Sequence, residues 1–415
     1  QAAGKQGVVT GSMYRIWGQE GALTGRYHNI VGILTETASA RIASPDTVAL
    51  EALERGAAPG RGLSEYGFQI AFVDPWRGGE WTLGDIVDYQ MIAAGSVLEQ
   101  TAKFSQHYIM GRWQMGSETI AKAEMEGPRA YVISRDQIDP IAAAEMVDKL
   151  ILQGVEVHES VEAFEAIAEQ DLWASPKGGT LENDAAREDN EDEGDPDDED
   201  EGSEHEGELR TFPAGSWIVY GAQPGRAAVL DLLEPRRRQV QHEWPGGPFM
   251  RSYDGAAYTM PMQMGIEIAR IDNAFEVNTR PATAARILGP PVPTATDWYA
   301  FSAEVTRSYQ AVNRLLEAGL SVFKAASDDG PIFIVTASDP QSRAVLTEIS
   351  NQIGVTVVAD PPAVSMSVQQ QAARIGVYQG WAGSMDEGWT RLVLENFDYA
   401  YETLMNHDVR EKGLS

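Results

Sequence analysis

The sequence contains no cysteine. This absence excludes disulfide bonds, thiolate metal ligands and a cysteine nucleophile. Long apolar runs are also missing: no stretch of about 18 apolar residues occurs, so we expect no membrane span. Basic residues are few, since 32 lysines and arginines face 62 acidic residues, for a formal net charge of −30. Because nucleic acids are bound by basic surfaces, this balance argues against a nucleic-acid partner.

Histidine is scarce as well, with six residues in the chain. The sequence has neither the H-E-x-x-H motif of zinc hydrolases nor the G-x-S-x-G elbow of serine hydrolases. Its H-x-x-E pair, His205 and Glu208, lies in an acidic stretch where we expect no rigid scaffold for tetrahedral metal geometry. Without such motifs, the composition alone indicates an α/β protein and no particular chemistry.

The composition is that of a globular protein, with 43% hydrophobic residues, and a length of 415 residues predicts two to four domains. The negative charge is unevenly spread. Between Glu182 and Glu208 there are 16 acidic residues and one basic residue, Arg187, so this tract carries −15, half of the net charge. Such a low-complexity, self-repelling stretch has nothing to bury, and we interpret residues 182–209 as a disordered surface insert.

Strands and helices are predicted in alternation, the pattern of an α/β architecture. Apolar or alternating segments predict strands, and apolar residues at helical spacing predict helices. The predicted strands lie at 129–134, 155–160, 215–221, 297–302, 320–326 and 330–336, and the predicted helices at 139–154, 223–235, 308–319 and 340–350.

These elements occur twice in the same order. Aligned without gaps, "SWIVYGAQPGRAAVLDLL" and "IFIVTASDPQSRAVLTEI" place Val219 on Val335, an offset of 116, whereas upstream Gly154 falls on Gly319, an offset of 165. The difference of 49 residues is extra sequence in the first copy and includes the acidic tract. The tract therefore lengthens a loop of a repeated unit. The alternative is chance similarity, because all βα units share the same pattern.

Two further blocks flank the repeats. Residues 27–39, "YHNIVGILTETAS", predict an apolar strand that ends at an acid, Glu36, and residues 81 to about 113 predict a long helix. At the other end, residues 374–404 predict a strand, a loop, a helix and a second strand. Two strands and one helix do not make a closed core, so we expect a truncated α/β domain here. The start, "QAAGKQGVVTGSMYR", has no initiator methionine, which predicts a processed chain or a piece of a longer one.

The segment "YHNIVGILTETASA" resembles the end of the catalytic domain of carboxypeptidase A-like zinc carboxypeptidases, in particular a large bacterial subgroup with long C-terminal extensions. Further phrases similar to that subgroup follow in order: "WTLGDIVDYQMIAAGSVLE", "FPAGSWIV", "VLDLLEP", "YTMPMQMGIE" and "RIGVYQGWAGSMDEGWTRLVLENF". The resemblance implies a zinc carboxypeptidase-like end at 1–115, α/β units at 116–290 and 291–370, and the start of an amidotransferase-like domain at 371–415. It also implies a peptide substrate and a secreted or periplasmic location.

By this resemblance Glu36 is the general base toward a zinc-bound water and then the acid toward the leaving amine. Its alternative is an exposed acid at the end of a strand. Tyr14 resembles the tyrosine that closes over the substrate in this family. The alternative interpretation is that Tyr14 is an ordinary packed or half-exposed aromatic residue. His28 is not carried over as a ligand. The zinc ligands of the family, a His-x-x-Glu pair and a later His, are expected before residue 1, so we expect this chain alone to be inactive.

Two other interpretations stay open. The chain could be a non-catalytic extracellular module that binds a small ligand or a glycan at the strand ends, lined by aromatic side chains of the loop at 242–262. These side chains are Trp244, Phe249, Tyr253, Tyr258 and Met260. In "MDEGWTR", Asp386, Glu387 and Arg391 invite a catalytic interpretation, but Ser384 or Asp386 as a helix cap and an i, i+4 ion pair explain them better.

The acidic tract generates a prediction. Deletion of residues 183–208 should leave the melting temperature nearly unchanged, or raise it at low salt, because self-repulsion is removed. Calorimetry in low and high salt measures this effect. Loss of the cooperative transition on deletion would show instead that the fold needs the tract.

Overall fold

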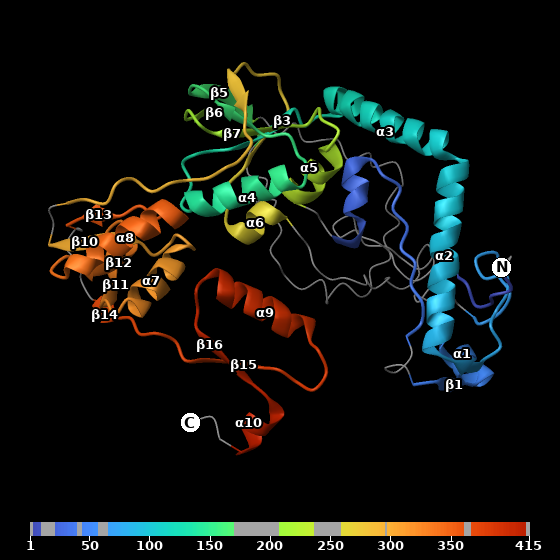
Figure 1. Ribbon diagram of the computed structural model, residues 1–415. Coiled ribbons are helices and arrows are strands. Elements are labelled where there is room, and N and C mark those ends of the chain that lie inside the picture. The colour runs from blue at the N-terminus through green and yellow to red at the C-terminus, as the bar shows by residue number, and fades with distance from the viewer. Residues whose placement is uncertain are drawn as a thin grey trace, which may run out of the picture.

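The structure is a computed structural model that describes residues 3–9, 21–39, 44–56, 65–169, 207–235, 259–294, 297–360 and 367–411. Within these ranges the protein is a mixed α/β fold with five small sheets. Four parts follow one another along the chain (Figure 1): an N-terminal segment, two repeats with five-stranded sheets, and a C-terminal unit.

The N-terminal segment covers the described residues up to Glu126 and is dominated by two long helices, α2 (Leu83–Lys103) and α3 (Ser105–Glu126). Thr82 and Asp85 form a capping box at the start of α2. The smaller elements are η1 (Gly21–His28), β1 (Asp46–Val48), α1 (Leu50–Gly56) and β2 (Gly79–Trp81). Strands β1 and β2 pair antiparallel. Among the described residues no helix is long and apolar enough to cross a membrane.

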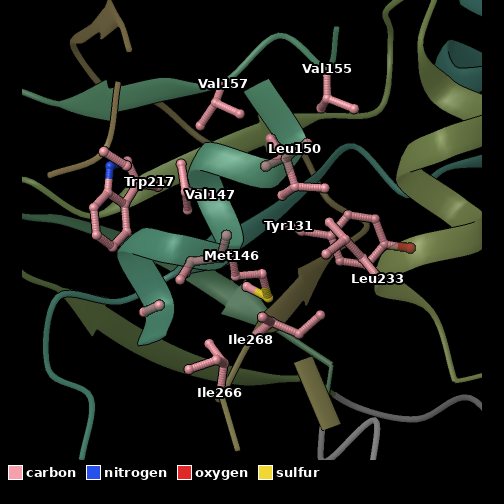
Figure 2. Close-up of a cluster of buried hydrophobic side chains, with 14 of the residues drawn as sticks. Tyr131, Met146, Val147, Leu150, Val155, Val157, Trp217, Leu233, Ile266 and Ile268 are labelled. Atoms are coloured by element: carbon pink, nitrogen blue, oxygen red, sulfur yellow. The ribbon is translucent and has the colours of Figure 1, made fainter. Parts of the chain in front are cut away.

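The first repeat is an antiparallel sheet with the strand order β8-β3-β7-β4-β9 and helices packed against it. Its elements are β3 (Ala130–Ile133), α4 (Pro140–Leu152), β4 (His158–Ser160), β7 (Trp217–Tyr220), α5 (Arg226–Leu233), α6 (Met260–Met264), β8 (Ala269–Ile271) and β9 (Thr279–Pro281). Figure 2 shows its core, in which Met146, Val147 and Leu150 of α4 pack against Tyr131 and Trp217 of the sheet. All five of these side chains are fully buried.

The second repeat has the strand order β13-β10-β12-β11-β14, again antiparallel. Its elements are β10 (Trp298–Ser302), α7 (Ser308–Glu317), β11 (Val322–Ser327), β12 (Gly330–Thr336), α8 (Pro340–Ile353), β13 (Val358–Ala359) and β14 (Ser367–Gln369). The first four strands of each repeat follow the βαββαβ order of the split βαβ, or ferredoxin-like, arrangement. In each repeat the fifth strand extends the sheet at one edge.

The duplication expected from the sequence is confirmed residue by residue. In the first repeat Val219 pairs with Tyr131, and in the second its equivalent Val335 pairs with Tyr299. Likewise His158 pairs with Ile218, whereas Phe323, 165 residues after His158, pairs with Ile334, 116 residues after Ile218. Both offsets found in the sequence therefore hold in the strand register.

The helix ends confirm the same alignment. Gly154 follows α4 with φ +83° and Gly319 follows α7 with φ +77°, a left-handed conformation that favours glycine. The N–H of the next residue then donates back to a helical carbonyl, Val155 to Leu150 at 3.0 Å and Leu320 to Leu315 at 3.0 Å. Each glycine thus reverses the chain from helix to strand in the same way.

The insertion lies where the offset changes. In the second repeat β11 and β12 are joined by Asp328 and Asp329 alone. In the first repeat the corresponding connection contains an antiparallel pair, β5 (Phe164–Ala168) and β6 (Glu208–Phe212), and the acidic tract lies between these two strands in sequence. The tract itself lies outside the described residues.

The C-terminal unit consists of β15 (Ile375–Tyr378), α9 (Met385–Asn396), β16 (Tyr401–Leu404) and α10 (Asn406–Glu411). β15 and β16 pair with each other in parallel, and α9 connects them in sequence. The predicted strand, helix and strand are therefore confirmed. The unit is held to α7 by hydrogen bonds. Arg314 Nε and Gln310 Nε2 donate to Asp398 Oδ2 at 2.6 and 2.9 Å, and Asn313 donates to the Phe397 carbonyl at 2.8 Å.

Two expectations for the N-terminal segment were wrong. Residues 27–39 form no strand: Tyr27 and His28 end η1, and residues 29–39 have no regular secondary structure. An apolar run forms a strand only if a neighbouring strand supplies hydrogen bonds, and the described part of the chain offers none there. The long helix, expected from 81 to about 113, is divided at Phe104 and extends to Glu126.

Two glycines of the second repeat give a matched prediction. Gly319 and Gly354 both follow helices, at φ +77° and +82°. A Cβ on Gly319 meets nothing within 4 Å, whereas one on Gly354 would lie 2.4 Å from the Ile287 carbonyl oxygen. We expect Gly319→Ala to cost about 1–2 kcal/mol for the left-handed backbone, and Gly354→Ala a further 1–3 kcal/mol or so for the clash. Urea unfolding measures both; equal losses would contradict the packing at Gly354.

A second prediction concerns Asp398. Burial opposes its ionisation, but hydrogen bonds from Arg314 and Gln310 outweigh burial and lower the pKa of Asp398. The charged form therefore holds the C-terminal unit at neutral pH, and this contribution is lost only as the pH falls through the lowered pKa. Asp398→Asn keeps a residue that tolerates the observed φ of +54° and removes the charge, and should weaken docking by about 1 kcal/mol.

Small-angle X-ray scattering at neutral pH tests this, since undocking increases the radius of gyration. Asp386→Asn is the control, because Asp386 lies exposed in the same unit. If the radius of gyration of Asp398→Asn stays at the parent value at low protein concentration and also in moderate urea, the charge does not hold the unit.

Candidate functional site

The candidate catalytic residue Glu36 lies exposed on a stretch of backbone that is fastened to α2. Thr35 Oγ1 donates to Gln90 Oε1 at 3.2 Å, and Gln90 Nε2 donates to Thr37 Oγ1 at 2.8 Å. One residue further, Trp81 Nε1 donates to the Ala38 carbonyl at 2.9 Å. The threonines on either side of Glu36 thus contact the same glutamine, and the side chain of Glu36 is exposed.

Most of the other predicted site residues lie outside the described part of the chain. Tyr14 lies outside the described residues, as do Trp244, Phe249, Tyr253 and Tyr258 of the proposed aromatic cleft. Met260 is described, and it is partly buried against the core of the first repeat. His28 ends η1, and its Nε2 lies 3.4 Å from the side-chain nitrogen of Gln153.

The described residues do not fit a zinc ion. Among them no group of three or more His, Asp or Glu side chains is placed to hold a metal. In this part of the chain no histidine is hydrogen-bonded to Glu36. The residues next to it in sequence, Thr35, Thr37 and Ala38, contact Gln90 and Trp81. A metal centre that uses Glu36 therefore requires ligands from other residues.

The most strongly perturbed titratable group is structural. Tyr131 lies in the core of the first repeat, and its hydroxyl donates to Glu234, which also pairs with Arg270 at 2.8 Å. Burial, followed by the charge of Glu234, raises the pKa of Tyr131 far above its usual range. Arg270 in turn pairs with Asp272 at 3.0 Å. This network supplies hydrogen-bond partners to the buried and half-buried polar groups around β8.

The "MDEGWTR" segment is a helix start, as the capping interpretation predicts. The side chain of Ser384 accepts from the Glu387 N–H, and Asp386 and Glu387 occupy the first turn of α9. Glu387 and Arg391 form the expected i, i+4 ion pair. These contacts account for all three charged residues without a catalytic role.

A cavity of about 450 Å³ lies between α3 and the first repeat. One wall is a face of α3 with Ile109, Arg112, Trp113, Gly116, Ser117 and Ile120; the other is made by Tyr27, His28, Asn29, Gly154, Pro224 and Gly225. One hydrogen bond crosses between the walls and another holds the second wall together. Arg112 Nε donates to the His28 carbonyl at 3.2 Å, and Asn29 Nδ2 donates to the Pro224 carbonyl at 3.0 Å.

Sequence reasoning missed this cavity because its residues come from four separate segments and form no motif. One signal was present in the sequence: Ile109, Trp113, Gly116 and Ile120 recur at helical spacing in a helix that was expected to end near Trp113. Gly116 interrupts that stripe, and it is one of the residues that line the cavity. Comparison of the chain with family models, with curated proteins and with solved structures finds no match.

Proposed function

We propose that Glu36 is the proton-transferring carboxylate of a carboxypeptidase A-like metallopeptidase, and that the chain contributes this residue to a centre whose metal is held by other residues. The observation that carries the proposal is the anchoring of Thr35, Thr37 and Ala38 to α2 and to Trp81. It fixes the backbone around Glu36 and leaves the carboxylate exposed. A general base must hold a defined position and reach the proton that it takes up.

The residues before Glu36 support a role in a larger catalytic unit. Ile30, Val31, Ile33 and Leu34 are exposed to 46, 60, 66 and 43%. Four neighbouring large apolar side chains in water are unfavourable, by about 25 cal/mol for each Å² that could be buried. A partner strand along residues 30–34 would bury them and supply the hydrogen bonds that the strand pattern anticipates. This arrangement would place Glu36 at the end of a strand, as the resemblance implies.

In this proposal Glu36 takes a proton from the attacking water and passes it to the leaving amine of a peptide. Thr35 and Thr37 keep the carboxylate oriented through Gln90, so they are positioning residues. The described residues do not fit zinc, so in this proposal the metal is held by other residues. The secreted or periplasmic location stays part of the same proposal.

The test uses zinc binding and peptide hydrolysis together. The 415-residue chain should bind zinc only weakly and at several sites in a calorimetric titration, because no three ligands converge in its described part. In the full-length gene product, however far it extends, we expect one tight zinc site and release of C-terminal residues from peptides. There Glu36→Gln should keep the zinc and lower kcat by at least about 100-fold, since glutamine cannot accept the proton.

Glu51→Gln is the matched control, because Glu51 is also an exposed glutamate of the N-terminal segment, at the start of α1. It should hydrolyse at the parent rate. Near-parent turnover in Glu36→Gln would refute the assignment of Glu36, and a single tight zinc site in the 415-residue chain would refute the assignment of the ligands to other residues.

A further inference from the structure

The cavity between α3 and the first repeat has a charge that sets it apart from the rest of the chain. The chain carries 62 acidic and 32 basic residues, yet the twelve residues that line the cavity include Arg112 and His28 and no aspartate or glutamate. A cavity with a guanidinium group and no carboxylate favours an anion over a cation.

Arg112 has donors to offer. Its Nε donates to the His28 carbonyl, which fixes the guanidinium group at the cavity wall. Within the described part of the chain, its two terminal amino groups have no hydrogen-bond partner and no ion pair, and the side chain is exposed. A guanidinium group held by one nitrogen presents its remaining N–H groups as a fork, the geometry that matches a carboxylate.

The same wall also offers an apolar surface beside the charge of Arg112. Trp113 and Ile109 are exposed to 67 and 69%, and with Ile120 they give the cavity an aromatic and aliphatic side. Gly116 stands between them with no side chain, so a ring can approach the helix backbone there. A cavity of about 450 Å³ is in the range of small-molecule sites.

We propose that this cavity binds a small aromatic carboxylate, with its ring against Trp113 and over Gly116 and its carboxylate on Arg112. Arg112 ties α3 to His28 of the opposite wall, and within that wall Asn29 is held to Pro224, so the site exists without a ligand. Glu36 does not line it. The proposal is therefore independent of the peptidase assignment, and failure of one leaves the other standing.

The probe is 1-naphthaleneacetate, titrated calorimetrically into the 415-residue chain, with 1-naphthaleneacetamide as its uncharged analogue. We expect one site, at least tenfold weaker binding of the amide, and weaker binding of the acid at high salt. Arg112→Gln should weaken the acid at least tenfold and leave the amide nearly unchanged. Lys122→Gln removes a positive charge from the same helix outside the cavity and should have no effect.

A second pair of variants locates the site. A Cβ on Gly116 would lie 3.6 Å from Asn29 Nδ2, an ordinary contact, so Gly116→Leu can fold while its side chain fills the cavity and abolishes binding. Gly111→Leu makes the same change on α3 where a Cβ meets nothing within 4 Å, and should bind as the parent does. Parent-like binding in Gly116→Leu, equal binding of acid and amide, or binding at several equivalent sites would each overturn the proposal.

Discussion

The first repeat, the second repeat and the C-terminal unit meet at one junction at the start of α7. The buried Asp139 carboxylate caps α4 by accepting from the Ala142 N–H at 2.9 Å, and its second oxygen accepts from the Thr306 N–H of the second repeat at 2.7 Å. Next to it, Arg307 pairs with Glu145 of α4 at 2.5 Å and donates to the Asn396 carbonyl of the C-terminal unit at 2.8 Å. Because the Asp139 carboxylate is buried and the side chains of Arg307 and Glu145 are half-buried, separating the parts leaves these charged groups without partners, which makes the junction specific.

The repeats were predictable because each carries its own hydrophobic pattern and its own turn chemistry. Gly154 and Gly319 mark the same reversal, and Val219 and Val335 hold the same place in the sheet, so local sequence and fold agree. Residues 27–39 failed the same kind of reasoning because a strand is defined by its neighbour, and the pattern of one segment contains no information on whether that neighbour is present.

The candidate sites divide in the same way. The sequence resemblance pointed to Glu36, but only the structure shows that Gln90 holds the threonines on both sides of it. The cavity could not be predicted, because Arg112, Asn29 and Gly154 are remote in sequence and meet only when α3 lies across the first repeat. The cap at Ser384, by contrast, was predictable because a capping residue and its helix are adjacent in sequence.

Burial is concentrated in the repeats, and the flanking parts take their positions from them. α2 and α9 have no buried residue, whereas α4 has seven. The N-terminal segment reaches the first repeat through Tyr27, which is 8% exposed in that core and donates to Asp231 at 3.0 Å. Glu36 follows nine residues later, where Gln90 and Trp81 hold the chain a second time. The backbone between these two anchors is thus fixed at both ends. The N-terminal segment has little core of its own, but these anchors give the backbone at Glu36 a defined position.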